Sequence, residues 1–341
     1  MLRYLNQPVM VAALAAVLTG CFTSAAPVNE VRGQVLGGDY SVKWVGDPLP
    51  ASELAGKLAR LLQAFEQQMS AQQENSDLSR FNRLPAGGCM QLQGHFLRLA
   101  TAAVEFHRFS DGALDVTLAP LLRIWGVHSQ PQSQDRRGPP DPQQLAAVLP
   151  NLGQQHLHLQ DDLLCKDVPL ELDFSSIASG YLVDQLELLL RDQLIESYMI
   201  ELPGDLKAVG QKAGSRPWRI SLEEPRDDIR VAQQILDVDS FAVSTSGNHR
   251  RQLRVDGRLH AHGFDMETGW PLQHRLVSVT VVEPSAMRAD GLSSILMVMG
   301  PEHGWAFALS HDIAAAFVTR RDAHYEVQRT PAFNVLLTDK E

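Results

Sequence analysis

Short strand-like segments, interleaved with helical segments, are the feature that most limits what this chain can fold into. Apolar residues recur at helical spacing in 51–73, 96–109, 176–194, 286–299 and 302–310. Strand-like runs occupy 39–45, 196–202, 217–222, 235–244, 251–255, 276–282 and 313–319. Several of these strands are separated by connections of hairpin length. This arrangement favours an α+β fold with a mixed sheet over a parallel, doubly wound sheet.

The N-terminal residues have the features of an export signal. Arg3 precedes an apolar run, Val9–Leu18, that is too short to span a bilayer comfortably. The run leads through Leu-Thr-Gly to Cys21, which resembles the lipobox of bacterial lipoproteins, where the cysteine is acylated. A buried N-terminal helix with a chance cysteine is the alternative. We expect a signal peptide over 1–20, a lipidated tether over 21–34, and a position on the periplasmic side of a bacterial membrane, anchored through Cys21.

The charge and the cysteines set two further limits. The chain has 30 Lys and Arg against 40 Asp and Glu, a net charge of −10, and no basic block, which argues against a nucleic-acid partner. An acidic protein that handles an anion needs a metal, helix N-termini or a few placed cations. Cys89 and Cys165 remain when Cys21 is lipidated. In an oxidising compartment they form a disulfide or stay as separate thiols, and the sequence leaves both open.

Small and acidic residues stand between a strand and a helix in segment 172–184. The strand ends at Asp173, and either Ser175 or Ser176 is expected to cap the helix that follows. The free N–H groups and the positive end of that helix would face an anion. The alternative is an ordinary capped helix after a strand.

A carboxylate and a hydroxyl are paired in segment 289–294. If this segment is helical, Asp290 and Ser294 are four residues apart and share one face. Such a pair suits a hard cation such as Mg²⁺, which prefers oxygen ligands. A solvent-facing aspartate beside a serine is the alternative.

Segment 259–271 carries histidine and aspartate around a predicted turn at 265–269. His262 and Asp265 are close enough to share one site, and histidine serves as an acid or a base near neutral pH. Zinc is a weaker interpretation of His260 and His262, because no cysteine or third spaced histidine completes a site. A polar surface hairpin is the remaining alternative.

A fourth segment, 110–121, places Asp115 and Thr117 in a turn of small residues after a helix. The turn suits the edge of a planar ligand, or it merely caps the helix.

Taken in order with other runs, these segments resemble the ApbE-type FAD:protein FMN transferases over about 33–337. The similar runs are Ser76–Asn82, Gly112–Pro120 with Trp125-Gly126, Asp173–Asp184, Gly204-Asp205, Trp218, Glu224–Arg226, Ser244–Gly247, His262–Gly269, Val277–Val281 and Ala289–Ser294.

The resemblance implies a single domain over 35–341, with a mixed, largely antiparallel sheet and packed helices. It also implies Mg²⁺-dependent transfer of the FMN part of FAD to a threonine or serine of an exported acceptor protein, with release of AMP. Exported subunits of sodium-pumping NADH:quinone oxidoreductases or of Rnf-type complexes are the acceptors that the family implies.

Roles carried over from the family fall on matching positions. The metal ligands would be the side chains of Asp290 and Ser294 and the backbone carbonyl of Ser176. His262 would help to remove the proton of the acceptor hydroxyl, and Asp265 would orient His262. The residues expected to contact FAD are Leu36, Ala113, Leu114, Asp115, Asp173, Ser179 and Gly263.

The chain departs from the family pattern at several of these positions. Ser179 replaces a lysine and removes one cation from the phosphates, whereas Ser294 replaces a threonine and keeps the ligand oxygen. Leu36 replaces a methionine, and Gly263 and Met266 replace the isoleucine and proline of an Ile-x-Asp-Pro run. Two other functions therefore stay open: a Mg²⁺-dependent FAD pyrophosphatase that gives FMN and AMP, and a non-catalytic FAD-binding lipoprotein.

Overall fold

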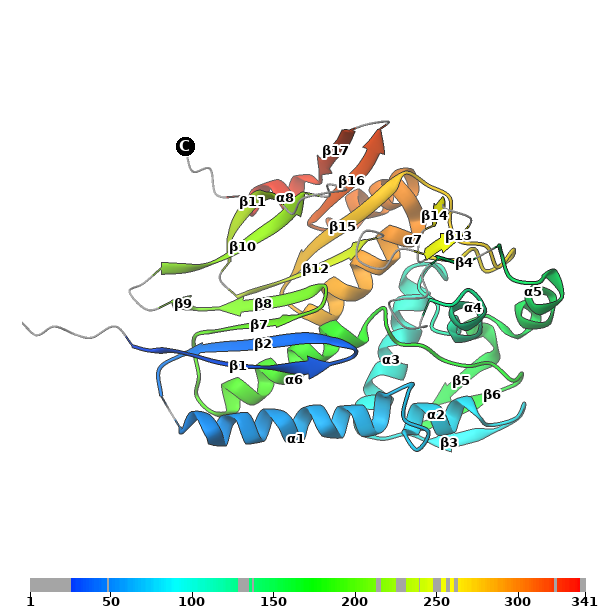
Figure 1. Ribbon diagram of the computed structural model, residues 1–341, viewed down its shortest axis with the longest axis horizontal. Coiled ribbons are helices and arrows are strands. Elements are labelled where there is room, and N and C mark those ends of the chain that lie inside the picture. Colours follow the sequence, from blue (N-terminus) through cyan, green and yellow to red (C-terminus); the bar gives the residue numbers. More distant parts are fainter. Residues whose placement is uncertain are drawn as a thin grey trace, which may run out of the picture.

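An eight-stranded antiparallel sheet forms the centre of the protein, which is shown as a computed structural model in Figure 1. The structure describes residues 26–47, 49–127, 135–136, 138–212, 216–224, 231–238, 240–247, 253–255, 258–260, 263–321 and 324–337. In spatial order the strands are β1 (Val28–Val35), β2 (Gly38–Val45), β7 (Tyr198–Leu202), β8 (Asp205–Val209), β12 (Phe241–Gly247), β15 (Leu276–Glu283), β16 (Ala315–Arg321) and β17 (His324–Arg329).

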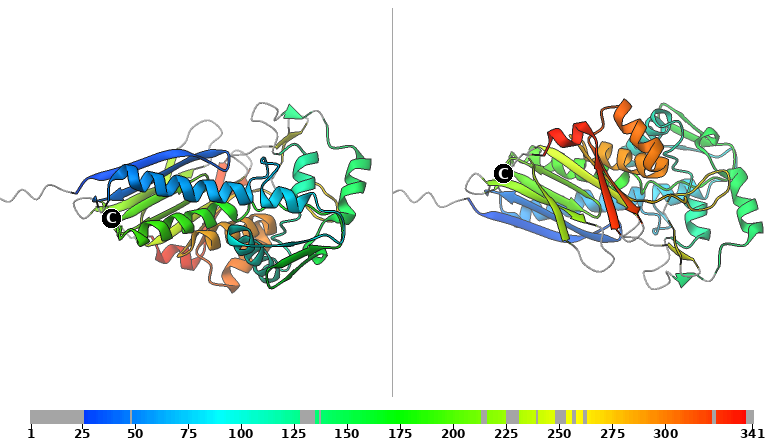
Figure 2. Two further views of the ribbon diagram at one scale, coloured as in Figure 1. Left: turned by 90° about the horizontal axis from the view of Figure 1, so that it is seen from below. Right: turned by 90° about the horizontal axis from the view of Figure 1, so that it is seen from above.

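Helices cover one face of this sheet (Figure 2, left). They are α1 (Ala51–Met69), α6 (Ala178–Asp192) and α7 (Ala286–Ser310). The fold of α1 follows from its sequence, because its buried residues are spaced three or four apart: Leu54, Leu58, Leu62, Phe65 and Met69. They pack against the alternate residues of β2 that face the same side, Tyr40, Val42 and Trp44.

A smaller layer lies on the opposite face of the sheet (Figure 2, right). It contains β9 (Gln211–Lys212), β10 (Arg216–Glu224), β11 (Val231–Val238) and α8 (Pro331–Val335). A separate apolar cluster, which includes Trp218, Val243 and Phe333, fills the space between this layer and the sheet. The sheet is therefore buried on both faces over its central strands.

Beyond one end of the sheet lie the remaining helices, with two small sheets (Figure 1). The helices are α2 (Asp77–Asn82), α3 (Gly94–Phe109), α4 (Ala119–Ile124), α5 (Pro142–Val148), η1 (Leu149–Asn151) and η2 (Gln154–His156). The strands are β3 (Cys89–Gln91), β5 (Leu157–Gln160) and β6 (Leu163–Lys166), then β4 (Asp135–Arg136), β13 (Leu253–Val255) and β14 (Arg258–His260). Cys89 and Cys165 are opposite each other in β3 and β6 and form a disulfide, which decides between the two states that the sequence left open.

The predicted α+β fold with a mixed, largely antiparallel sheet is confirmed, and β4 and β13 form a parallel pair. Three local expectations were wrong. The predicted strand over 235–244 is two strands, because the chain moves from β11 in the outer layer to β12 in the central sheet around Ser240, whose φ is 65°. Helix α1 ends at Met69 rather than at residue 73. Helix α6 begins after Ile177 with no side-chain cap, so neither Ser175 nor Ser176 caps it.

Among the described residues, no helix is both long enough and apolar enough to span a membrane. The expected signal peptide and Cys21 lie outside the described residues. Of the expected tether over 21–34, residues 28–34 belong to β1, which pairs with β2 at the edge of the central sheet.

Candidate functional site

The predicted metal ligands meet where the start of α6 lies against α7. Ser294 Oγ donates a hydrogen bond to the carbonyl of Ser176 at 3.3 Å. Four residues further along the chain, in α6, the N–H of Gly180 donates to Asp290 Oδ2 at 2.9 Å. The partner residue moves back four positions, from Ser294 to Asp290, as the chain advances four positions from Ser176 to Gly180. The two segments therefore run antiparallel, with one contact per helical turn, and we call this series of contacts the ladder. The structure therefore brings together Ser176, Asp290 and Ser294, which are far apart in the sequence.

The close approach of α6 and α7 depends on Gly180. A Cβ added to Gly180 would lie 2.3 Å from the carbonyl oxygen of Ala286 and 2.7 Å from Cβ of Asp290. Both distances are far below van der Waals contact, and the first involves backbone that has little freedom to move. Glycine at this position sets the spacing of the helices that carry the predicted ligands.

A third contact of the ladder fixes the first turn of α7. The Asp184 carboxylate accepts hydrogen bonds from the N–H groups of Ala286 and Met287, at 2.8 and 3.0 Å, and from Ser285 Oγ at 2.7 Å. Lys207 is almost fully buried, with Nζ 3.8 Å from Asp184 Oδ1 and 2.7 Å from the carbonyl of Pro284. A carboxylate at a helix N-terminus is stabilising, so Asp184 holds the start of α7 against α6.

Two buried carboxyl groups give this site its electrostatic character. Asp290 is 6% exposed and Asp205, at the start of β8, is 3% exposed. Burial raises the pKa of Asp290 well above its usual range, and the Asp205 carboxyl raises it further, whereas the Gly180 N–H lowers it. A bound cation would offset this repulsion. The predicted metal ligands at Ser176, Asp290 and Ser294 are all oxygen atoms, which suits a hard divalent cation.

This donor set differs from a cluster of ionisable side chains. Within the described ranges, no group of three or more His, Cys, Asp or Glu side chains is placed to hold a metal. The predicted set has one carboxylate, one hydroxyl and one carbonyl, so it does not depend on such a cluster.

A row of serine hydroxyls adjoins the ladder at the end of β12. Ser246 Oγ lies 2.8 Å from Ser293 Oγ and 3.3 Å from Ser294 Oγ, and Ser244 Oγ lies 3.2 Å from Ser293 Oγ. These contacts give a structural meaning to the Ser244–Gly247 run, to which the sequence assigned no role. The hydroxyls attach the predicted ligand helix α7 to the sheet.

A pocket of about 860 Å³ lies along the C-terminal half of α7. Its other walls are the loop after α3 and the segment around Phe264. The lining residues include the predicted FAD contacts Ala113 and Asp115, together with Asp265. Gly263 lies at the edge of the pocket, because a Cβ added there would be 2.6 Å from Cδ1 of the lining residue Leu272. The apolar surface of the pocket suits a planar ring system.

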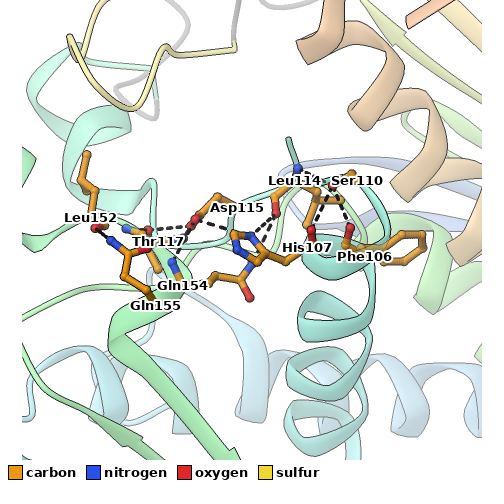
Figure 3. Close-up of polar contacts among 10 residues, drawn as sticks. Phe106, His107, Ser110, Leu114, Asp115, Thr117, Leu152, Gln154 and Gln155 are labelled. Atoms are coloured by element: carbon orange, nitrogen blue, oxygen red, sulfur yellow. Dashed lines mark hydrogen bonds and ion pairs between the residues drawn. The ribbon is translucent and has the colours of Figure 1, made fainter. Parts of the chain in front are cut away.

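Asp115 holds the loop after α3 in shape (Figure 3). Its Oδ1 accepts from the N–H and the hydroxyl of Thr117, at 2.8 and 2.6 Å, and its Oδ2 accepts from the N–H of Gln154 at 3.0 Å. His107 Nδ1 donates to the carbonyl of Leu114 at 3.0 Å and lies 3.7 Å from Asp115 Oδ2. The Leu114 side chain is 3% exposed and packs in the core, so the loop reaches the pocket through its other residues.

Asp265 organises the predicted turn at 265–269, which is present. Its Oδ1 accepts from the N–H groups of Glu267 and Thr268, at 2.8 and 3.1 Å, and its carbonyl accepts from Gly269 N at 2.8 Å. Trp125 Nε1 donates to the Gly269 carbonyl at 2.8 Å, which ties this turn to α4. His262 lies outside the described residues, so the pairing of His262 with Asp265 stays a prediction.

The remaining predicted residues link the pocket to the ladder. Asp173 N donates to the carbonyl of Val116 at 2.7 Å, and Asp173 Oδ1 accepts from Ser175 N at 2.8 Å. The loop that lines the pocket therefore lies directly beside the segment that enters α6. Ser179 Oγ, next to Gly180, is buried and has no hydrogen-bond partner in the described part of the chain.

Leu36 lies in the turn of the β1–β2 hairpin, which points toward α3 (Figure 1). Leu36 and Gly37 both have positive φ, 52° and 74°, as in a two-residue type I′ turn. Gly38 packs against Pro203, since an added Cβ would be 2.3 Å from Cγ of that proline. Leu36 lies at the end of the sheet where β8 begins with Asp205, and it does not line the pocket along α7.

Sequence reasoning assigned no role to two residues that support Asp173. Asn82 Nδ2 donates to the Leu172 carbonyl at 3.0 Å, and Asn82 Oδ1 accepts from Leu172 N at 2.8 Å. The fully buried Lys166 donates to the carbonyls of Phe81, Asn82 and Leu170, and burial lowers its pKa to about 8. Asn82 ends the Ser76–Asn82 run, so the resemblance located it, whereas no local pattern identifies Lys166.

Comparisons with known proteins identify the family of this chain. A profile of the ApbE family matches residues 36–317. The FAD:protein FMN transferase of Vibrio cholerae serotype O1 is 34% identical over 324 residues, which cover 94% of this chain and 96% of that protein. The protein of the same name from Salmonella typhimurium is 32% identical over 341 residues, 96% of this chain and 97% of that protein.

Solved structures give the same result. The crystal structure of the flavinyl transferase ApbE of Pseudomonas stutzeri, in its apo form, superimposes with a TM-score of 0.83 at 41% identity, covering 92% of this chain and 98% of that chain. The flavin transferase ApbE of Vibrio cholerae superimposes with a TM-score of 0.82 at 34% identity, covering 91% of this chain and 100% of that chain. The family profile, the relatives and the fold together show that this chain belongs to the ApbE family.

Proposed function

We propose that this chain is a FAD:protein FMN transferase, which uses Mg²⁺ to move the FMN part of FAD to a threonine or serine of an acceptor protein. The observation that carries the proposal is the contact between α6 and α7. In this contact Ser176, Asp290 and Ser294 lie together, and α7 continues into a wall of the pocket that two of the predicted FAD contacts, Ala113 and Asp115, also line. The names of the related proteins support the same reaction.

The residues of the ladder fit a metal ion. The Ser176 carbonyl, the Asp290 carboxylate and the Ser294 hydroxyl would hold Mg²⁺, which supplies positive charge to the phosphate oxygens during transfer. The start of α6 directs the positive end of its dipole toward the same place. Ser179 offers a hydroxyl where the family has a lysine, so hydrogen bonding replaces one ionic contact.

The reaction that we propose balances as follows. The oxygen of the acceptor hydroxyl forms a bond to the phosphorus of the FMN part, the pyrophosphate P–O bond breaks, and AMP leaves. The hydroxyl proton is lost, and we propose His262 as the group that helps to remove it. Asp265 would orient His262, because the turn that Asp265 holds follows directly after His262.

The pyrophosphatase alternative uses the same site, with water in place of the acceptor hydroxyl. The binding-protein alternative rests on the loss of the family lysine at Ser179. Retention of Asp290 and His262 argues against the binding-protein alternative, since a protein that only held FAD would need neither a metal ligand nor a base.

We propose that the protein acts outside the cytoplasm, on the periplasmic side of a bacterial membrane. The predicted signal peptide over 1–20 and the lipidated Cys21 support this location. The disulfide between Cys89 and Cys165 supports it independently, because structural disulfides are typical of oxidising compartments. Suitable acceptors would be exported subunits of sodium-pumping NADH:quinone oxidoreductases or of Rnf-type complexes.

The test uses the chain from Phe22 onward, with FAD, Mg²⁺ and a purified acceptor domain that carries a Ser/Thr-Gly-Ala-Thr-like segment. Flavin fluorescence of the acceptor in a denaturing gel and an added FMN mass, together with AMP, are the expected results. EDTA and the Asp290→Asn variant should remove both products. AMP and free FMN without labelled acceptor would favour the pyrophosphatase. Bound FAD without either product, tested with several acceptors, would favour the binding protein.

A further inference from the structure

Helix α7 changes direction at Gly300 and Pro301. Gly300 has φ 78° and ψ −176°, which are not helical values, and Pro301 follows it. Proline has no N–H group, so the carbonyl four residues earlier loses its helical donor. That carbonyl belongs to Met297. The bend therefore leaves one backbone acceptor that needs a partner from elsewhere in the molecule.

His274 supplies that partner. Its Nε2 lies 2.9 Å from the Met297 carbonyl, and because a carbonyl only accepts, Nε2 carries the proton. The ring also packs on the bend, since a Cβ added to Gly300 would lie 3.1 Å from His274 Cδ2. Burial lowers the pKa of His274, which keeps the ring neutral near pH 7. His274 is thus fitted to the bend by one hydrogen bond and by shape.

The bend lies in a wall of the 860 Å³ pocket. The lining residues of α7 stand on both sides of the bend: Val298, Met299, His303, Ala306, Phe307 and Ser310. The opposite wall includes Phe264, Asp265, Met266 and Leu272. His274 follows Leu272 by two residues but does not line the pocket. The hydrogen bond from His274 to Met297 therefore joins the two walls from outside the cavity.

We propose that His274 is a positioning residue that sets the width of this pocket, and with it the affinity for the part of FAD that the pocket holds. The proposal rests on the proposed function, because it takes FAD as the ligand. The predicted metal ligands Asp290 and Ser294 precede the bend by a full turn or more, so the effect concerns FAD binding rather than the transfer step.

Two substitutions separate the hydrogen bond from the bulk of the ring. In His274→Gln, the amide nitrogen reaches the same carbonyl and does not titrate. His274→Leu introduces an apolar side chain of similar size and leaves the Met297 carbonyl without the hydrogen-bond donor from residue 274. Loss of a partner from a buried polar group corresponds to roughly a tenfold change in an equilibrium constant. His158→Leu, at an exposed position in β5, is the matched control.

The dissociation constant of FAD is measured by quenching of flavin fluorescence in EDTA, and KM and kcat follow from AMP release with Mg²⁺. We expect a roughly tenfold weaker FAD affinity and a correspondingly higher KM in His274→Leu, with kcat at saturating FAD within about twofold of the unchanged protein. His274→Gln should restore most of the affinity. Circular dichroism and thermal unfolding establish that both variants are folded.

Several results would overturn the proposal. One is FAD binding by His274→Leu that is as tight as binding by His158→Leu, and another is binding by His274→Gln that is as weak as binding by His274→Leu. A fall in kcat at unchanged FAD affinity would also contradict it, since the effect would then lie in the transfer step. Failure of the unchanged protein to bind FAD would instead refute the proposed function itself. The FAD titration of the unchanged protein distinguishes this outcome from the others.

Discussion

Replacing Gly180 by alanine tests whether the spacing of α6 and α7 controls the reaction. The added methyl group would lie 2.3 Å from the Ala286 carbonyl oxygen, whereas ordinary contacts begin at 3.4 Å. The helices would have to separate by about 1 Å to accommodate it. That movement would draw Asp290 away from the Ser176 carbonyl, since Asp290 lies on the same part of α7.

The size of the effect follows from two opposing contributions. Alanine is favoured over glycine in a helix by about 1 kcal/mol. Overpacking of a tight contact costs about 1–3 kcal/mol, and more when backbone is involved. We therefore expect Gly180→Ala to lower the free energy of unfolding by about 1–2 kcal/mol. The effect on turnover should be larger, about 100-fold, because a displacement of about 1 Å strongly affects positioned catalytic groups.

The assay combines urea unfolding with Mg²⁺-dependent AMP release from FAD. Gly56→Ala is the matched control, since Gly56 is also within a helix and its added Cβ would meet only the end of the Arg60 side chain, at 3.6 Å. That variant should be as stable as the unchanged protein or more stable, with the same turnover. If Gly180→Ala behaved like Gly56→Ala in both measurements, the close approach of the helices would not govern the site, and the reasoning would be refuted.

Three further predictions concern charge, covalent structure and pH. Asp290→Asn removes a predicted metal ligand and should abolish Mg²⁺-dependent turnover. It also removes the repulsion between two buried carboxyl groups, so the thermal midpoint of unfolding in EDTA should stay equal or rise. Remaining Mg²⁺-dependent turnover would exclude Asp290 as a ligand. Reduction of the Cys89–Cys165 disulfide, which spans 76 residues, should lower stability by about 4 kcal/mol in urea unfolding, and an unchanged midpoint would contradict this. Because the pKa of His274 is lowered by folding, the unfolded chain binds more protons than the folded chain. The contribution of His274 to the free energy of unfolding is therefore present above pH 6.5 and is lost as pH falls toward the folded-state pKa. His274→Gln should lose less stability over that range, and parallel plots of unfolding free energy against pH for the two proteins would refute this.

The sequence predicted those parts of the fold that follow from local periodicity. The long helices α1, α3, α6 and α7 and the strands β2, β10 and β15 arise from apolar spacing, which is a property of each segment alone. Short strands such as β8 and β17 were not predicted, because their burial is decided by neighbours that are distant in sequence. The separate outer layer of β10 and β11 was missed for the same reason.

The site was predictable in composition and only partly in geometry. Helical spacing placed Asp290 and Ser294 on one face, but nothing local indicated that Gly180 is the hydrogen-bond partner of Asp290. Gly180, to which the sequence assigned no role, makes room for α7. Lys166 shows the limit most clearly, because its role depends on three carbonyls that only the folded chain brings together.

The ladder between α6 and α7 has a consequence for how the protein acquires its site during folding. Its contacts join residues that are 102, 110 and 118 positions apart, so each requires closure of a long loop of chain. A nascent chain that has not yet produced α7 contains the first half of the site and lacks the Asp290 carboxylate. The proposed nucleotide and metal would therefore recognise only the complete fold, and at 100 times its dissociation constant a ligand would stabilise the whole domain by about 2.7 kcal/mol. A thermal-shift screen of nucleotides and cations would thus report on this site through global unfolding.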